Sequence, residues 1–268
     1  MNIAFIGGGN MATALIAGLA QQAGNRFHVV DPNADALARL AAQYGATTAP
    51  AIDGELASVD VIVLAVKPQQ MREVAAALAP QLGSQLVLSI AAGIRSADLS
   101  RWMKGYGAIV RAMPNTPALI RQGITGMVAM PGVTEGQRAA ADSVLRAVGQ
   151  TVWLEDEALI DPVTAVSGSG PAYVFYFLEA MQAAAVDMGL SEEQGKQLAL
   201  ATFAGATQLA AESSESLDVL RQRVTSKGGT THAAISSMEG AGLKGAIVEA
   251  MKAAAARGRE LGDELGAD

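Results

Sequence analysis

Three small residues near the N-terminus have the types and spacing of a phosphate-binding turn. Gly7, Gly9 and Ala12 follow a short apolar run and precede a helical pattern. Gly7 permits a tight turn, Gly9 allows the backbone to approach a pyrophosphate, and Ala12 lets the helix pack closely on the strand. The helix dipole and free N–H groups would then point at the phosphates. The predicted dinucleotide-binding turn consists of Gly7, Gly8, Gly9, Asn10, Met11 and Ala12.

An acidic residue follows at the distance expected for contact with the adenosine ribose of a dinucleotide. Asp31 ends the apolar run His28–Val30 and lies 19 positions after Ala12, close to the spacing of about 20 in such sites. A carboxylate there accepts a hydrogen bond from the 2′-hydroxyl and repels a 2′-phosphate, which favours NADH. Asp31 could instead turn away beside Pro32 and leave room for the phosphate, so NADPH and NADH both stay open. The plainer alternative for the whole segment is a glycine-rich turn that serves packing alone.

Two further loops carry polar groups at the ends of predicted strands. Lys67 follows the apolar run 60–66, and open α/β sheets bind ligands at the carboxyl ends of their strands. Lys67 could face a phosphate or the nicotinamide ribose, or it could be a solvated lysine. In the segment 111–117, two prolines fix the backbone around Asn115, whose amide would suit the carboxamide of a cofactor or a small substrate. The alternative there is a proline-braced turn without a ligand.

Another polar loop, Ser226–Thr231, precedes a predicted helix in the second half of the chain. Its backbone N–H groups could hold a small carboxylate, and a hydroxyl could bond a neighbouring nitrogen. The same residues could simply cap the helix through Thr230 or Thr231. His232 follows, but a lone histidine on a helix is more often packed or solvated than catalytic. The glycine–serine segment Ser167–Pro171 lacks the G-x-S-x-G pattern of a nucleophile elbow, so we expect it to cap a helix.

These loops need a scaffold, and residues 1–160 alternate between short β-rich runs and helical patterns, as βαβ units do. Strands are expected at 1–6, 26–30, 60–66, 85–90, 108–111, 126–129 and 151–153. Helices are expected at 11–21, 33–44, 69–82 and 135–148. The continuously apolar run 60–66 is typical of a parallel strand buried on both faces. The sequence thus predicts an α/β fold whose N-terminal domain, 1–160, is a Rossmann-like doubly wound sheet that binds the dinucleotide.

Residues 161–268 have a different character, with long alanine-rich helical patterns and almost no strand signal. Helices are expected at 171–188, 191–211, 217–224, 232–239 and 245–261. Ser191 and Gln194 form a capping-box signature at the start of one of them. The helix 171–188 is apolar nearly all round, so it must be buried inside the domain or against another subunit. So short a segment cannot bury this much apolar surface alone, and we predict an all-helical domain that forms a homodimer.

Composition excludes several classes of function. The chain of 268 residues has a net charge of −7 and no basic stretch, which argues against nucleic acid and anionic membranes as partners. It has no cysteine, and His28 and His232 are its only histidines, so thiolate chemistry is excluded and we expect no metal site. No apolar stretch approaches the ~18 residues of a membrane span, and the N-terminus lacks the pattern of a signal peptide. We expect a cytoplasmic protein.

Five motifs follow one another in an order that characterises a known family. The segments Gly7–Ala12, Ala65–Pro68, Arg111–Pro117, Ser167–Tyr173 and Val224–Thr231 resemble those of pyrroline-5-carboxylate reductases. The resemblance covers essentially the whole chain, and its last segment is the most diagnostic because it lies outside the generic nucleotide fold. It implies reduction of the small-molecule substrate 1-pyrroline-5-carboxylate to L-proline by NAD(P)H, the last step of proline biosynthesis. It also implies a helical domain that forms homodimers, often within rings of dimers.

The resemblance assigns roles to individual residues as well. It implies a pyrophosphate contact at Gly7–Ala12 and makes Thr231, nearest the imine nitrogen, the candidate catalytic residue. The implied substrate-binding residues are Ser226, Gly228, Gly229, Thr230 and Thr231. The implied nicotinamide-side residues are Ala65, Val66, Lys67, Pro68, Ala91, Ala92 and Gly93. The chain departs from many family members at Lys227, where proline is common, and at 51–54, where an asparagine is absent.

The implied reaction needs little acid–base machinery, because hydride transfer to a protonated cyclic imine relies on the cofactor. We expect the amides of Gly228–Thr231 to bind the carboxylate and the Thr231 hydroxyl to bond the ring nitrogen. One alternative is a β-hydroxyacid dehydrogenase, but those enzymes use a lysine in the inter-domain helix, and 171–188 contains none. The other is a dinucleotide sensor or scaffold without catalysis.

Overall fold

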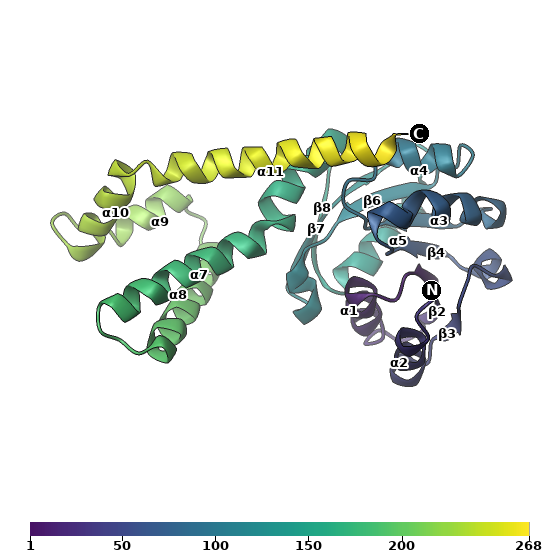
Figure 1. The fold of residues 1–268 in the computed structure, drawn as a ribbon, viewed down its shortest axis with the longest axis horizontal. Coiled ribbons are helices and arrows are strands. Elements are labelled where there is room, and N and C mark those ends of the chain that lie inside the picture. The colour runs from purple at the N-terminus through teal and green to yellow at the C-terminus, as the bar shows by residue number, and fades with distance from the viewer. Residues whose placement is uncertain (268) are drawn as a thin grey trace. The chain divides into compact units, whose positions relative to one another are not determined.

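The structure is a computed structural model of the chain and describes residues 1–267 (Figure 1). Contacts divide these residues into two units. The first comprises Met1–Gly170 together with 253–267, and the second comprises Pro171–Lys252. The last turns of the C-terminal helix therefore belong to the first unit, although 161–268 is predicted as one domain. The bounds of the two domains, 1–160 and 161–268, stay a prediction.

The first unit is built on an eight-stranded sheet with the order β3-β2-β1-β4-β5-β6-β7-β8. The strands are β1 (Asn2–Ile6), β2 (Arg26–Val30), β3 (Thr47–Ala49), β4 (Val61–Leu64), β5 (Leu86–Ser89), β6 (Ile109–Met113), β7 (Gly123–Ala129) and β8 (Gly149–Trp153). The strands from β3 to β6 pair in parallel, β7 pairs antiparallel with β6, and β8 pairs in parallel with β7. The order reverses between β1 and β4, which confirms the predicted Rossmann-like doubly wound sheet.

Helices cover both faces of this sheet, as Figure 1 shows. They are α1 (Asn10–Leu19), α2 (Ala34–Tyr44), α3 (Met71–Leu78), α4 (Ser96–Trp102) and α5 (Glu135–Arg146). Because side chains of a strand alternate between faces, Ile3 and Phe5 of β1 join one core with α1, α2 and α5. Ala4 and Ile6 join the other core with α3 and α4. Short turns complete the unit: η1 (Gly54–Ser58), η2 (Pro68–Gln70), η3 (Ala79–Gln81), η4 (Thr116–Ile120), η5 (Glu157–Leu159), α6 (Ile160–Val163) and the π-helical η6 (Thr164–Gly168).

Local signals explain where the helices begin and end. The side chain of Asn33 caps α2 by accepting the N–H groups of Asp35 and Ala36, and Gly45 ends the helix at φ 66°. The helix predicted over 69–82 is shorter, because Pro80 lacks an N–H group and the chain tightens into η3 after Leu78. Strand β3 and helix α4 are absent from the prediction. Both are short, and Arg95 at the start of α4 is no capping signal.

The second unit consists of helices. They are α7 (Gly170–Asp187), α8 (Glu192–Glu212), α9 (Leu217–Arg223), α10 (Thr230–Gly240) and the first turns of α11 (Leu243–Gly266). The predicted capping box at Ser191 and Gln194 is present, and the rings of Phe177 and Phe203 lie 6.4 Å apart where α7 packs on α8. In the single chain the apolar helix α7 leaves Phe175 and Tyr176 exposed, by 60% and 74%. Such a surface needs a covering partner.

Candidate functional site

The first glycine of the N-terminal turn is fixed by its backbone. Gly7 follows β1 with φ 103°, and its N–H group donates a hydrogen bond of 2.8 Å to the carbonyl oxygen of Val30. A Cβ atom at this position would lie 2.7 Å from the carbonyl oxygen of Ala65. Both the conformation and the close approach of Ala65, directly after β4, therefore require glycine.

The next residues open the N-terminus of α1 to a ligand. Gly9 occupies the N-cap position in an extended conformation, and glycine has no side chain that could cap the helix. No heavy atom of the described residues lies within 4 Å of the place where its Cβ would be. The first N–H groups of α1 are thus accessible beside a free space, which fits the pyrophosphate of a dinucleotide.

Asp31 turns toward the glycine turn. Its Oδ2 accepts a hydrogen bond of 2.7 Å from the N–H group of Gly8, and its Oδ1 accepts one of 2.8 Å from Asn33. The alternative in which Asp31 turns away beside Pro32 is therefore wrong in this structure. Each carboxylate oxygen keeps a further lone pair that could receive a ribose hydroxyl, so that contact stays a prediction.

The other predicted cofactor residues lie at the same edge of the sheet. The parallel strands β1, β4, β5 and β6 are neighbours, and Gly7–Ala12, Ala65–Pro68 and Ala91–Gly93 follow the carboxyl ends of the first three. Hydrogen bonds from Ala65 N–H to Ile6 and from Ile90 N–H to Leu64, of 2.8 and 3.2 Å, align these loops. The fold thus brings the predicted loops together where open α/β sheets bind ligands. Their contacts with a cofactor stay predictions.

Asn115, after β6, is engaged within the fold. Its Nδ2 donates to the carbonyl oxygen of Ser167 at 3.1 Å, and its Oδ1 accepts from the N–H group of Ile124 at 3.0 Å. The Ser167 hydroxyl donates to Val163 at 3.0 Å. The helix capping expected for Ser167–Pro171 is therefore wrong, because the π-helical turn η6 leads directly into α7 and no free helix start exists there. Asn115 braces the loop after β6, and its predicted cofactor contact stays a prediction.

An ion pair between a buried arginine and a partly exposed glutamate lies beside this edge, and the spacing of the sequence does not reveal it. Arg111 in β6 is 4% exposed, and its Nη1 donates to Oε1 of Glu157 at 2.8 Å. The same oxygen accepts the N–H group of Ser96, the first residue of α4, at 2.7 Å. Glu157 therefore ties β6 to the end of the loop that follows β5.

In the second unit, Ser226–Thr231 forms an open helix start. Gly228 has φ 76°, the N–H group of Gly229 donates to Ser226 at 3.0 Å, and α10 begins at Thr230 with Gly229 as its N-cap. No side chain among the described residues caps this helix, so the alternative of a threonine cap is wrong. Thr231 and the neighbouring Thr230 are exposed. The accessible N–H groups and hydroxyls fit a small carboxylate, and their substrate contacts stay predictions.

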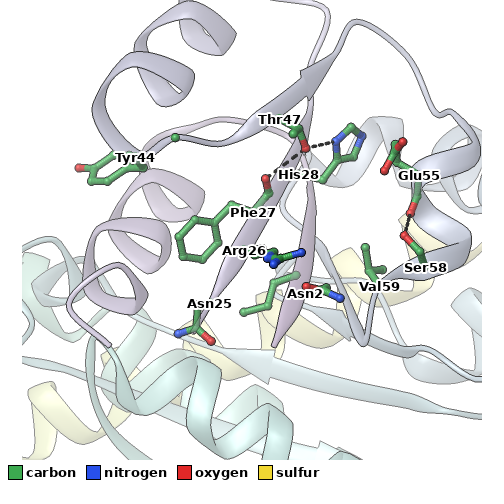
Figure 2. Close-up of a pocket in the computed structure, with 12 residues that line it drawn as sticks. Asn2, Asn25, Arg26, Phe27, His28, Tyr44, Thr47, Glu55, Ser58 and Val59 are labelled. Atoms are coloured by element: carbon green, nitrogen blue, oxygen red, sulfur yellow. Dashed lines mark hydrogen bonds between the residues drawn. The ribbon is translucent and has the colours of Figure 1, made fainter. Parts of the chain in front are cut away.

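Figure 2 shows a pocket of about 460 Å³ at the opposite edge of the sheet, where β1 and β2 begin. Its buried His28 has Nδ1 2.8 Å from the hydroxyl of Thr47 and Nε2 3.2 Å from Oδ1 of Asp53. Thr47 in turn donates to the carbonyl oxygen of Phe27. Both ring nitrogens thus face partners within the fold, and we assign His28 a structural role. No cluster of three or more metal-binding side chains occurs among residues 1–267, and none of the helices formed by these residues is long and apolar enough to span a membrane.

Two family models match the chain. Residues 2–93 match the model described as NADP oxidoreductase, coenzyme F420-dependent, and residues 157–261 match the model described as pyrroline-5-carboxylate reductase dimerisation. Together with the doubly wound sheet and its glycine turn, these matches define the class. The protein is an NAD(P)H-dependent oxidoreductase with a helical dimerisation domain, and it is a homo-oligomer.

Relatives that match over nearly the full length of the chain show to which family within this class it belongs. The pyrroline-5-carboxylate reductase of Pseudomonas aeruginosa is 46% identical over 98% of both chains. The structure of such a reductase from Coxiella burnetii is 40% identical with a TM-score of 0.90 over 97% of this chain and 98% of the other. A Plasmodium falciparum pyrroline carboxylate reductase with NADP bound is 28% identical with a TM-score of 0.86 over 98% of both. The chain belongs to the pyrroline-5-carboxylate reductase family.

Proposed function

We propose that this protein reduces 1-pyrroline-5-carboxylate to L-proline at the expense of NADPH or NADH. The observation that carries the proposal is the open start of α10 at Ser226–Thr231. This feature belongs to the helical unit and not to the generic dinucleotide fold. Its N–H groups and hydroxyls suit a substrate that carries both a carboxylate and a ring nitrogen.

The residues at the carboxyl edge of the sheet are proposed to bind the cofactor. Gly7–Ala12 would hold the pyrophosphate at the start of α1, and Asp31 would face the adenosine ribose. Ala65–Pro68, Ala91–Gly93 and Asn115 would line the nicotinamide side. The bound cofactor supplies a hydride to the imine carbon.

The substrate is proposed to bind at the helical loop. The N–H group of Gly229 is engaged by the carbonyl oxygen of Ser226, so the N–H groups of Gly228, Thr230 and Thr231 bind the carboxylate, where the positive end of the α10 dipole favours the negative charge. The Thr231 hydroxyl oxygen accepts a hydrogen bond from the N–H group of the protonated imine and stays bonded to this nitrogen, which becomes an amine as the imine carbon gains a hydride. Since the imine is protonated before it reacts, no separate acid is needed. Orientation of the two reactants supplies most of the acceleration.

The proposed assembly is a homodimer that associates further into a ring of dimers, in a cytoplasmic enzyme of proline biosynthesis. The match to the dimerisation model and the exposed apolar side chains of α7 support the dimer. The family resemblance supports the ring. The acidic chain and the absence of cysteine support the location.

A turnover assay tests the proposed reaction. Purified protein is mixed with NADPH or NADH and either 1-pyrroline-5-carboxylate or open-chain 3-oxo acids, and loss of the reduced cofactor is followed by absorbance. We expect turnover with the cyclic imine and none above background with the oxo acids. Turnover of the oxo acids alone would support the β-hydroxyacid dehydrogenase class instead and refute the proposal.

A further inference from the structure

The last turns of α11 pack directly on the loop that follows β5. This loop, Ala91–Arg95, contains Gly93 at φ 74°. A Cβ atom on Gly93 would lie 3.1 Å from Cδ1 of Leu265 and 3.3 Å from Cβ of Leu261. The helix therefore packs closely on the backbone of the loop, and a Cβ atom on Gly93 would require Leu265 and Leu261 to shift.

An ion pair fastens the same helix to the end of the loop. Nη2 of Arg95 donates to Oδ1 of Asp263 at 2.7 Å and to the carbonyl oxygen of Arg259 at 3.2 Å. The guanidinium lies over Gly262, where a Cβ atom would come within 3.0 Å of Nε. The hydrogen bond from Arg95 to Asp263 also raises the pKa of Arg95. A second arginine, Arg101, donates to the carbonyl oxygen of Gly266 at 2.6 Å.

Glu157 also holds the end of this loop. The N–H group of Ser96, directly after Arg95, is bound by Glu157, which is itself paired with the buried Arg111. The Glu157 contact fixes the end of the loop, whereas α11 covers its middle. Together they leave the segment around Gly93 little freedom, although a glycine with positive φ is flexible by itself.

We propose that the face of α11 that carries Leu261, Asp263 and Leu265 is a positioning element that holds the loop Ala91–Gly93 in the geometry needed for hydride transfer. This role rests on the proposed function, in which the loop lines the nicotinamide. Hydride transfer depends on the placement of the donor to within a fraction of an ångström. Asp263 acts through Arg95 and does not touch the reactants, so it is a positioning residue.

Adjacent acidic residues of α11 provide a matched test. Asp263→Ala removes the pair with Arg95, whereas Glu264→Ala removes a pair with Arg257, which lies on the same helix at 2.7 Å. Both carboxylates are exposed. We expect Asp263→Ala to lower kcat/KM for NAD(P)H by about two- to fivefold, the range of an exposed ion pair. The KM for the imine should stay unchanged, the two variants should share the same melting temperature because each loses one exposed ion pair, and Glu264→Ala should keep the kcat/KM of the wild type. Equal activities of the two variants would overturn the proposal.

A charge reversal distinguishes the loss of a positioning contact from a general loss of folded structure. Arg95→Asp places two carboxylates against each other and should be less active than Asp263→Ala. Adding Asp263→Arg to this variant restores the pair in the opposite sense and should recover at least about half of the lost activity. A double variant no more active than Arg95→Asp would contradict the proposal.

Cofactor binding distinguishes a failure of this inference from a failure of the proposed function. NADH affinity is measured by fluorescence titration of the same variants. If the wild type does not reduce the imine, the proposed function fails. A two- to fivefold weaker NADH affinity of Asp263→Ala relative to Glu264→Ala, about the worth of an exposed pair, would still support the positioning of the loop. In that case, equal NADH affinities of the two variants would refute the positioning of the loop.

Discussion

Gly7 and Gly9 differ in what they require of the chain, although both belong to the same turn. Gly7 has positive φ and sits against the backbone of Ala65, whereas Gly9 has open space where its Cβ would be. The first glycine is therefore needed by the fold itself. The fold does not require glycine at the second position. Under the proposed function, only the binding of the pyrophosphate requires it.

This difference predicts that two alanine variants differ in stability but not in cofactor binding. Gly7→Ala should lower the free energy of unfolding of the cofactor-free protein by about 1–2 kcal/mol or more, because a left-handed backbone strains alanine and its Cβ meets Ala65. Gly9→Ala should leave that free energy unchanged. Both should weaken NADH binding at least about tenfold, or ~1.4 kcal/mol. Urea unfolding and fluorescence titration measure the two quantities, and tight NADH binding by Gly9→Ala would speak against the pyrophosphate contact.

Variants of Thr231 test the proposed role of the loop Ser226–Thr231 in substrate binding. We expect Thr231→Val, which keeps the shape and removes the hydroxyl, to lower kcat/KM for the imine about tenfold or more, because the ring nitrogen loses a hydrogen bond worth ~1–2 kcal/mol. Thr231→Ser retains the hydroxyl and should stay within about threefold of the wild type, since it loses less than ~0.7 kcal/mol. Steady-state kinetics decide the matter. If Thr231→Val kept kcat/KM within about twofold, or ~0.4 kcal/mol, the hydroxyl would have no role.

At the scale of elements, α5 and β8 are joined by a carboxylate. The hydroxyl of Thr151 donates to Oδ1 of Asp142 at 2.6 Å, and Arg146 binds the other oxygen. Partial burial raises the pKa of Asp142, but the hydrogen bonds from Thr151 and Arg146 outweigh it, so the pKa lies below its ordinary value. The folded state thus favours the ionised carboxylate.

The sign of this shift fixes a dependence of stability on pH. A lowered pKa in the folded state stabilises the protein above the unfolded pKa of about 3.9, and the effect is lost as pH falls through the folded value. We expect Asp142→Asn to lower the free energy of unfolding at neutral pH by about 1 kcal/mol. The difference from the wild type should vanish in acid. Urea titrations between neutral and acidic pH measure it, and a constant difference would show that the charge plays no part.

The elements were predictable where burial dictated the pattern. The apolar runs of β1, β2, β4 and β5 follow from strands covered on both faces, and Asn33, Gly45 and Ser191 mark helix ends by specific hydrogen bonds. The antiparallel direction of β7 was not predictable, because alternation and hydrophobicity carry no direction. The short β3 and α4 gave too little pattern.

The loops of the candidate site and the ion pairs that hold them differ in how far the sequence predicts them. The loops at the carboxyl edge were predictable, because each follows an apolar strand and carries glycine, proline or a lone polar residue. The ion pairs that brace them were not. Arg111 and Glu157 are 46 positions apart, and Arg95 and Asp263 are 168 apart. Only the fold brings such partners together.

At the scale of the whole molecule, the exposed apolar face of α7 is the feature that a single chain leaves unexplained. Phe175 and Tyr176 are more than half exposed, which is unfavourable for a helix with almost no polar face. Helix α7 lies within residues 157–261, which match the dimerisation model, so we expect a second copy of the chain to cover this face.

A charge placed on this face should dissociate the oligomer. We expect Phe175→Glu to shift the protein from dimer or larger assembly to monomer, because burying an unpaired carboxylate costs several kcal/mol. Ile120→Glu is the matched control, since Ile120 is 69% exposed but lies in the first unit. Analytical ultracentrifugation measures the mass of both. A Phe175→Glu variant that keeps the wild-type mass would place the interface elsewhere.

The central claim is the transfer of a hydride from the nicotinamide to the carbon of a cyclic imine. It is tested most directly with NADH or NADPH that carries deuterium at the transferred position of C4, incubated with 1-pyrroline-5-carboxylate and the protein. Mass spectrometry should find L-proline with a single deuterium, located on the ring carbon that was the imine carbon. Unlabelled proline, or no proline while the cofactor is consumed, would contradict the account.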